Sequence, residues 1–183
     1  MSVFLLQMLA MMFADKRIWE KSHLPIEARR DKLERNIGIV ANFFWLLAMV
    51  YSVFLPLRLG TIWFYIGLSI FVIGLIIMAI ATFNFITTAA DQLIIEGVYK
   101  FSRHPMYLST FIICLGSCIA TRSWLFIFFS IIMALCFFQE ALIEERYCLD
   151  KYGNAYREYI NRTFRWIGIP KKYNKWKTTI FLL

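Results

Sequence analysis

Long apolar blocks alternate along this chain with short segments rich in polar and positively charged residues. A membrane-spanning helix needs roughly 20 apolar residues, and the blocks at 37–59 and 62–86 are long enough to meet that requirement. The block at 3–14 is apolar but short. It therefore spans a bilayer only if it is hardly tilted or if the membrane thins locally.

The last two blocks, 107–120 and 124–143, are separated only by residues 121–123. Such a short connection joins antiparallel neighbours and predicts a tight helical hairpin. Together the blocks predict an all-α fold. We expect a polytopic integral membrane bundle of about five transmembrane helices, of which the first is short.

Composition supports this fold class. The hydrophobic fraction is 60% and only 17% of the residues are charged, whereas soluble domains average roughly 45–50% apolar and about 25% charged residues. Apolar residues in such excess, gathered into blocks, indicate an integral membrane protein. The 183 residues are expected to form one domain, 1–183, with N-terminal membrane helices at 1–88 and the functional half at 89–183.

The basic residues lie almost entirely on one side of the predicted membrane. All of the 20 lysines and arginines except Arg58 and Arg122 fall before residue 37, between 86 and 107, or after 143. By the positive-inside rule this side is cytoplasmic, so the central loop and the C-terminal tail can build one site. The net charge of +8 fits this orientation and attraction to anionic lipids. Nucleic-acid binding is disfavoured because the chain has no separate basic domain.

The loop at 97–107 carries the densest polar chemistry. It contains two cations, Lys100 and Arg103, the imidazole of His104 and two tyrosine phenols. Polar groups beside lipid are costly unless they bind or react with something. This density therefore predicts a site that meets a charged, water-borne ligand at the edge of the membrane.

A second cluster follows the last apolar block. Glu140, Glu144 and Glu145 lie where the predicted membrane helix passes into the tail, and Glu140 and Glu144 share a helix face. Such glutamates often form only a solvated helix end. Because these share a side with His104, we interpret the two clusters together as a binding site. Gly153 is expected to end the helix.

Several chemistries are disfavoured. The chain has four cysteines and two histidines, too few histidines for a histidine-rich metal centre. Cys114 and Cys118 lie one turn apart inside an apolar block, where packing is the better interpretation. The sequence has no P-loop, no Rossmann glycine pattern after a strand and no nucleophile elbow. We therefore predict no metal site.

The order of four motifs resembles the isoprenylcysteine carboxyl methyltransferase family, and the wider group of membrane methyltransferases that includes phospholipid N-methyltransferases. The motifs are Gly-x-Tyr-x-x-x-Arg-His-Pro-x-Tyr at 97–107, Glu-Glu at 144–145, Tyr-Gly-x-x-Tyr-x-x-Tyr at 152–159 and Arg-Trp-Ile at 165–167. The resemblance covers about the second half of the chain. It departs from the family pattern at Phe164, where Pro is frequent, and at Glu140, where Arg is frequent.

The resemblance implies S-adenosylmethionine as the cofactor, held between the cytoplasmic ends of the last membrane helices and a helical C-terminal tail that closes the pocket. It implies that the cofactor contacts the motif loop, the backbone before it and the glutamate pair. The implied cofactor-binding residues are Leu93, Ile94, Gly97, Tyr99, His104, Pro105, Tyr107, Glu144 and Glu145. The predicted catalytic residues are Glu144, Glu145 and Arg103. The amino-acid carboxylate of the cofactor suits Arg103 or Lys100.

The acceptor is expected to be a lipophilic or lipidated molecule that reaches the cytoplasmic interface, most like a prenylcysteine carboxylate. Phospholipid N-methylation is one alternative, and an NADPH-dependent reductase of the sterol reductase type is another. A non-catalytic membrane protein that keeps the motif for packing or partner binding is a third. A carboxylate acceptor needs no base, whereas an amine acceptor must first lose a proton. The sequence leaves the oligomeric state open.

Overall fold

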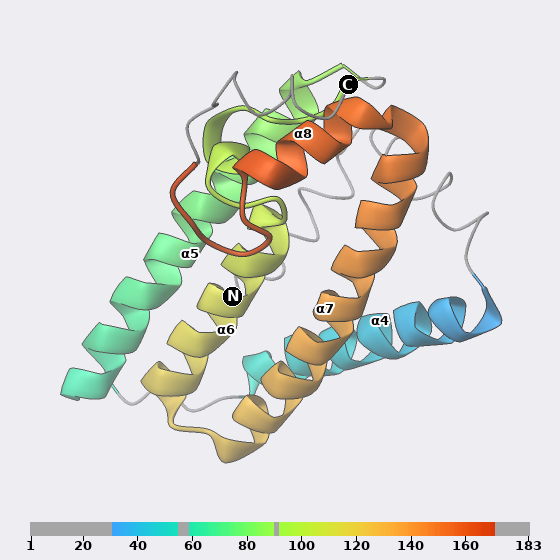
Figure 1. Cartoon of the computed structure of the whole chain (residues 1–183). Coiled ribbons are helices and arrows are strands. Elements are labelled where there is room, and N and C mark those ends of the chain that lie inside the picture. The colour runs from blue at the N-terminus through green and yellow to red at the C-terminus, as the bar shows by residue number, and fades with distance from the viewer. Residues whose placement is uncertain (1–30, 55–58, 90–91, 171–183) are drawn as a thin grey trace.

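The computed structural model describes residues 31–54, 59–89 and 92–170 (Figure 1). Within these ranges the chain is helical and contains no strand, which confirms the all-α prediction for the described part. The α-helices are α4 (Lys32–Val53), α5 (Ile62–Thr87), α6 (Pro105–Thr121), α7 (Trp124–Tyr152) and α8 (Asn154–Arg162), with a 3-10 turn η1 (Gly97–Lys100) before α6. The apolar block at 3–14 lies outside the described residues.

Two of the described helices, α5 and α7, are long and apolar enough to cross a membrane. Their outward surface is apolar as well: Ile73 and Phe83 of α5 and Leu135 of α7 are all exposed. A run of exposed large apolar side chains suits lipid and not water, as expected of an integral membrane protein. The predicted number of about five transmembrane helices stays a prediction.

Helices α5 and α6 pack with their backbones almost in contact. A Cβ atom on Gly67 would lie 2.4 Å from the backbone nitrogen of Ala120, and one on Gly116 would lie 2.5 Å from that of Phe71. Small residues that allow such close approach are the usual contact surface between membrane helices. This contact holds α6 against α5 and fixes the position of the loop that precedes α6.

The predicted hairpin between α6 and α7 is confirmed. Arg122 ends α6 in the left-handed conformation, with φ of 51°, and its backbone N–H donates to the Cys118 carbonyl. Ser123 caps α7 by accepting a hydrogen bond from the Phe126 N–H. Because the two helices are antiparallel, the start of α6 at His104 faces the far end of α7, where Glu144 and Glu145 lie.

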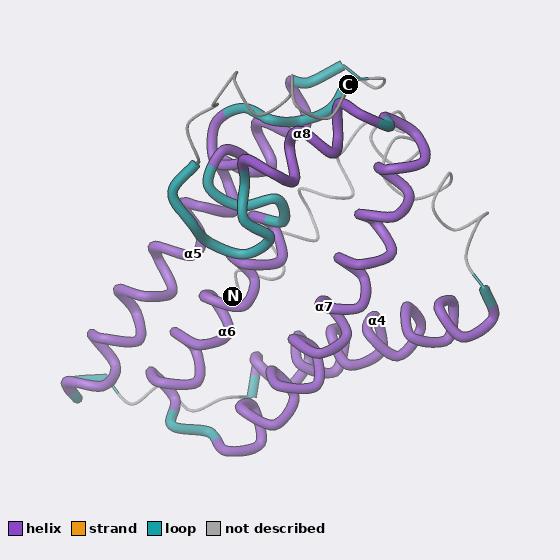
Figure 2. The backbone as a smooth tube through the Cα atoms, viewed as in Figure 1, coloured by secondary structure: helices purple, strands orange, loops and turns teal. Residues whose placement is uncertain are grey.

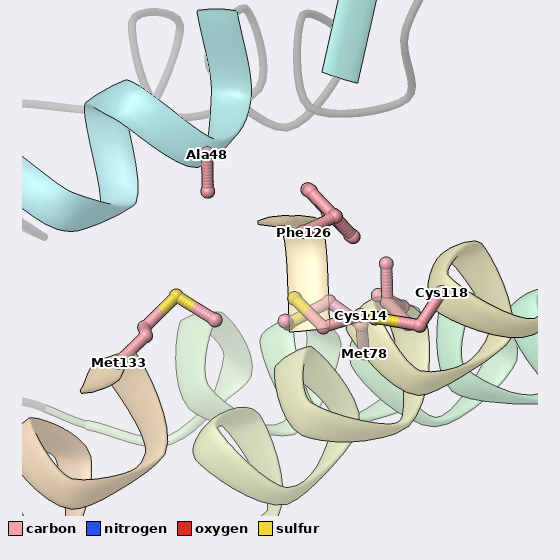
Figure 3. Close-up of a cluster of buried hydrophobic side chains, with 7 residues drawn as sticks. Ala48, Met78, Cys114, Cys118, Phe126 and Met133 are labelled. Carbon is pink, nitrogen blue, oxygen red and sulfur yellow. The ribbon is translucent and has the colours of Figure 1, made fainter. Parts of the chain in front are cut away.

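The buried core draws on all four long helices. Figure 3 shows its side chains, which are Ala48 of α4, Met78 of α5, Ile113, Cys114 and Cys118 of α6, and Phe126 and Met133 of α7. Helix α4 is joined to both ends of α7, because Glu34 forms an ion pair with Arg146 and Tyr51 forms a hydrogen bond with Ser123. The predicted halves 1–88 and 89–183 therefore share one core within the described residues.

Helix α7 continues past its apolar part to Tyr152, where Gly153 ends it as predicted. Gly153 has φ of 53° and donates its N–H to the Leu149 carbonyl. The left-handed conformation costs glycine little, so the chain turns sharply into α8. Helix α8 then lies across the same end of the molecule as η1, because the Tyr159 hydroxyl donates to the Tyr99 carbonyl at 2.7 Å.

Candidate functional site

The segment after α8 folds back and pairs with the loop before α6. The backbone N–H of Arg103 donates to the Phe164 carbonyl at 2.9 Å, and that of Gly168 donates to the Phe101 carbonyl at 3.1 Å. The Ser102 hydroxyl also donates to the Arg165 carbonyl at 3.1 Å. Figure 2 shows these loop segments gathered beside α8 at one end of the helices. The predicted motif loop and tail therefore meet.

Glu145 is the centre of this junction. Its Oε1 accepts hydrogen bonds from Arg103 Nε at 3.1 Å and Arg165 Nε at 2.8 Å, and its Oε2 accepts from Arg165 Nη2 at 2.7 Å. Arg103 Nη2 lies 2.9 Å from the same carboxylate. The carboxylate side chain is only 9% exposed. Charge-assisted and bidentate bonds are the strong class of hydrogen bond, so Glu145 ties the motif loop to the tail.

Arg103 also binds the end of α8. Its Nη1 donates to the Ile160 and Thr163 carbonyls, each at 3.2 Å. These carbonyls belong to the last turn of α8 and the residue after it, where backbone acceptors lack partners within the helix. Arg103 therefore joins three elements at once: the motif loop, α7 and the end of α8.

His104 lies between the two glutamates. Its Nδ1 is 3.3 Å from Glu144 Oε2, and its Nε2 is 3.3 Å from Glu145 Oε1. Burial alone would lower the pKa of His104, but hydrogen bonds to both carboxylates and their charges outweigh it and raise the pKa above its ordinary value. Only the protonated ring can donate from both nitrogens at once, so the two neighbouring carboxylates favour the cationic form of His104.

The pKa of Glu145, which lies beyond the apolar part of α7, is shifted in the opposite direction. Burial would raise the pKa of its carboxyl, but the hydrogen bonds from His104 and Arg165 and the charges of Arg103 and Arg165 hold the pKa far below its usual range. Glu145 is therefore ionised at any physiological pH and has almost no tendency to accept a proton.

Glu144 is placed differently. Its side chain is 31% exposed, and its Oε1 accepts a hydrogen bond from the Tyr107 hydroxyl at 2.5 Å. The Tyr107 ring stacks on His104 with centroids 5.8 Å apart and on Phe137 with centroids 4.8 Å apart. The result is an oriented, half-exposed carboxylate beside a row of aromatic rings.

Trp166 of the tail extends this aromatic surface. Its ring lies 6.2 Å from that of His104 and stacks on Phe138 of α7, again with centroids 6.2 Å apart. A small, partly open polar pocket of about 150 Å³ lies between the end of α8 and the motif loop, lined by residues that include Arg103, Thr163 and Arg165. Aromatic rings and guanidiniums thus both lie next to the carboxylate cluster.

The chain matches the model of the phospholipid methyltransferase family over residues 57–155. It belongs to this family of membrane methyltransferases. No curated protein and no solved structure matches the chain. The match covers the motif loop and both glutamates of the cluster, and it ends before the tail residues Arg165 and Trp166. The more specific likeness to isoprenylcysteine carboxyl methyltransferases stays a prediction.

In this phospholipid methyltransferase family member, the structure brings together five of the predicted site residues: Arg103, His104, Tyr107, Glu144 and Glu145. Pro105 begins α6 directly beside them. The other four precede the cluster in the chain. Tyr99 is buried in η1, Gly97 starts η1 with φ of 60°, and Leu93 and Ile94 lie half-buried in the irregular segment before it. Their role toward a cofactor stays a prediction.

Two contributions were missed. Arg165 belongs to one of the four motifs, but its ion pair with Glu145 was not predicted. The two residues are 20 positions apart in the sequence, and this separation does not show that the tail folds back onto α7. Phe137 was hidden among the apolar residues of a membrane helix, and only its ring contact with Tyr107 distinguishes it. Within the described ranges, no group of three histidines, cysteines or acidic residues is arranged to hold a metal ion.

Proposed function

We propose that this protein transfers a methyl group from S-adenosylmethionine to the amino headgroup of a phospholipid. The observation that carries the proposal is Glu144. It is a half-exposed carboxylate, oriented by Tyr107 and His104, in a chain of the phospholipid methyltransferase family. A carboxylate in this position suits an ammonium headgroup, which it can hold by charge and relieve of a proton.

The residues present also fit the methyl donor. A sulfonium is favoured by aromatic faces and by a nearby carboxylate, and Tyr107, Trp166 and Glu144 offer both. The cavity of about 150 Å³ beside Arg103 and Arg165 suits the carboxylate of an amino-acid head. It is smaller than the roughly 300–1,000 Å³ of most whole-ligand pockets, so it accounts for one end of the donor.

The length of α6 supports an acceptor that is itself a membrane lipid. With 17 residues, α6 is about 25 Å long, whereas the hydrocarbon core of a bilayer is about 30 Å thick. A cluster at the N-terminal end of such a short helix is expected at headgroup depth. An amino headgroup reaches it there without leaving its leaflet.

The chemistry assigned to the residues is simple. The ammonium of the headgroup gives a proton to Glu144, whose exposed side passes it to water. The free amine nitrogen could then attack the methyl carbon of a donor held beside Tyr107 and Trp166; the electrons of the carbon–sulfur bond would stay on sulfur as a thioether, and the methylated nitrogen would carry the positive charge. The donor supplies only the electrophilic methyl group. Alignment and exclusion of water are tasks for the aromatic residues. Glu145 is not suited to the base role, because His104 and the two guanidiniums lower its pKa so far that it hardly accepts a proton.

The test uses the purified full chain in vesicles of phosphatidylethanolamine and phosphatidylcholine, with radiolabelled S-adenosylmethionine. We expect label in the lipid fraction, and a loss of about 100-fold or more in E144Q, as is typical of general base removal. E158Q removes the same charge from an exposed glutamate of α8 and should keep full activity. Equal rates in E144Q and the wild type would contradict the base role.

Other acceptors are separate arms of the same experiment. A prenylcysteine carboxylate needs no base, so its methylation would persist in E144Q. Turnover of a prenylcysteine but not of phosphatidylethanolamine would favour the carboxyl methyltransferase alternative. Titration with NADPH tests the reductase alternative, which requires tight NADPH binding and no binding of S-adenosylmethionine.

A further inference from the structure

A second site lies at the opposite end of the helices from the glutamate cluster. Between the hairpin ends of α5, α6 and α7 is an open groove with a volume of about 690 Å³. It is lined by apolar side chains together with two indoles and one cation. We call it the hairpin groove. Its lining includes Trp63, Leu115, Arg122, Trp124 and Ile131.

The hairpin groove is separate from the candidate site. Arg122 follows the last residue of α6 and His104 precedes the first, so about 25 Å of helix lies between them. If α6 crosses the bilayer, the two sites belong to opposite leaflets. The groove therefore does not serve an acceptor that reacts at Glu144.

The walls of the groove call for an apolar occupant. Leu115 is 42% exposed and Ile131 is 55% exposed, and both line the groove from different helices. Its volume falls within the roughly 300–1,000 Å³ of ligand pockets. In a membrane the apolar molecules around the protein are lipids. An acyl chain that packs against these side chains fills the gap between α6 and α7.

Arg122 indicates what the other end of the occupant carries. It is exposed at the mouth of the groove, and no carboxylate among the described residues forms an ion pair with its guanidinium. Arg122 is also one of only two basic residues that fall outside the strongly basic segments, where the orientation rule disfavours a cation. Arginine pairs well with phosphate through its planar fork of donors.

The two indoles mark the same level of the membrane. Trp63 and Trp124 line the groove at the first turns of α5 and α7, and Trp124 is 84% exposed. Tryptophan is enriched where hydrocarbon meets headgroups. A lipid phosphate at Arg122 therefore lies at headgroup level, while its acyl chain extends along the groove toward Ile131.

We propose that the hairpin groove binds one phospholipid of the leaflet opposite the candidate site, with its phosphate at Arg122 and an acyl chain between α6 and α7. This lipid is a structural ligand and not the methyl acceptor. It fills a groove that the protein's own described side chains leave open, next to the Cys118–Ser130 contact.

The test is native mass spectrometry of the purified, delipidated full chain with added phosphatidylglycerol, compared with diacylglycerol. We expect the wild type to retain one phosphatidylglycerol. R122Q should bind it roughly tenfold more weakly, the typical cost of losing a hydrogen bond to a charged group. Gln must adopt the same left-handed backbone conformation as Arg122, so R122Q removes the guanidinium without changing the strain of the turn. R157Q, which removes an exposed arginine of α8, should bind like the wild type.

A second pair of variants tests the groove itself. L115W fills it and should abolish retention, whereas L135W places the same side chain on an exposed part of α7 outside the groove and should not. Diacylglycerol should bind weakly and without regard to R122Q. Retention of phosphatidylglycerol by R122Q at wild-type level, or equal loss in R157Q, would overturn the proposal. Unchanged methyl transfer in R122Q would support the separation of the two sites, and its loss would contradict it.

Discussion

Replacing Glu145 by Gln tests whether one carboxylate holds the tail on the motif loop. The substitution keeps the shape of the side chain and removes the charge that Arg103, Arg165 and His104 share. Two guanidiniums and the His104 imidazole are then left together around a neutral amide. The Arg103 side chain is 8% exposed, so its charge has little access to water.

The magnitude follows from this burial. Removing one partner of a buried ion pair costs about 3–5 kcal/mol. Arg165 is 28% exposed and recovers some hydration, so the lower end, about 3 kcal/mol, is the expected loss. For a chain of 150–250 residues each kcal/mol shifts the melting temperature by about 2–4 °C. We therefore expect E145Q to melt about 6–12 °C below the wild type.

The assay is thermal unfolding in detergent, followed by intrinsic tryptophan fluorescence, with E158Q as the matched control. Glu158 pairs with Arg162 on the exposed surface of α8, and such pairs are worth about 0.3–0.5 kcal/mol. Hydrogen exchange of the Arg103 and Gly168 amides, which bond across the loop–tail junction, should accelerate in E145Q alone. A melting temperature of E145Q that matches the control would refute the reasoning.

Three further predictions concern neighbouring parts of the molecule. H104Q should lose stability mainly at low pH. Because folding raises the pKa of His104, its protonation stabilises the folded protein fully below the ordinary pKa of 6.5. This stabilisation fades as the pH rises through the folded-state pKa. A difference in melting temperature between wild type and H104Q that stays constant across pH would exclude this. Y107F removes the hydroxyl that orients Glu144 and should lower kcat more than it changes the KM for phosphatidylethanolamine, whereas a pure KM effect would assign Tyr107 to binding. G116A places a methyl group 2.5 Å from the Phe71 nitrogen and should cost about 1–3 kcal/mol through overpacking, measured by thermal unfolding; no change would mean that α5 and α6 are less tightly packed than described.

The hairpin and the meeting of His104 with Glu144 were predictable from the sequence. The break at 121–123 is only three residues long, so the two apolar helices that it connects must run antiparallel. The distribution of basic residues then assigns both polar clusters to one end. Both features follow from insertion of the helices in the membrane, and the apolar pattern of the sequence predicts that insertion directly.

The assignment of partners was not predictable. Lys100 and Arg103 were equivalent cations in the sequence, but η1 leaves Lys100 exposed and turns Arg103 into the junction. The separate environments of Glu144 and Glu145 also depend on Arg165, whose approach is set by the turn at Gly153 and by the course of α8. Adjacent residues on a helix point in different directions. The position of the folded tail therefore determines that Glu145 is paired with arginines, whereas Glu144 stays available to a ligand.

The most direct test of the central claim is the position of the transferred methyl group. Wild-type protein in phosphatidylethanolamine vesicles is incubated with S-adenosylmethionine that carries a trideuterated methyl, and the lipids are fragmented by mass spectrometry. The account predicts the label on the headgroup nitrogen of phosphatidylethanolamine. Label that appears only on a prenylcysteine carboxylate supplied in the same vesicles, or on no lipid-soluble acceptor, would contradict it.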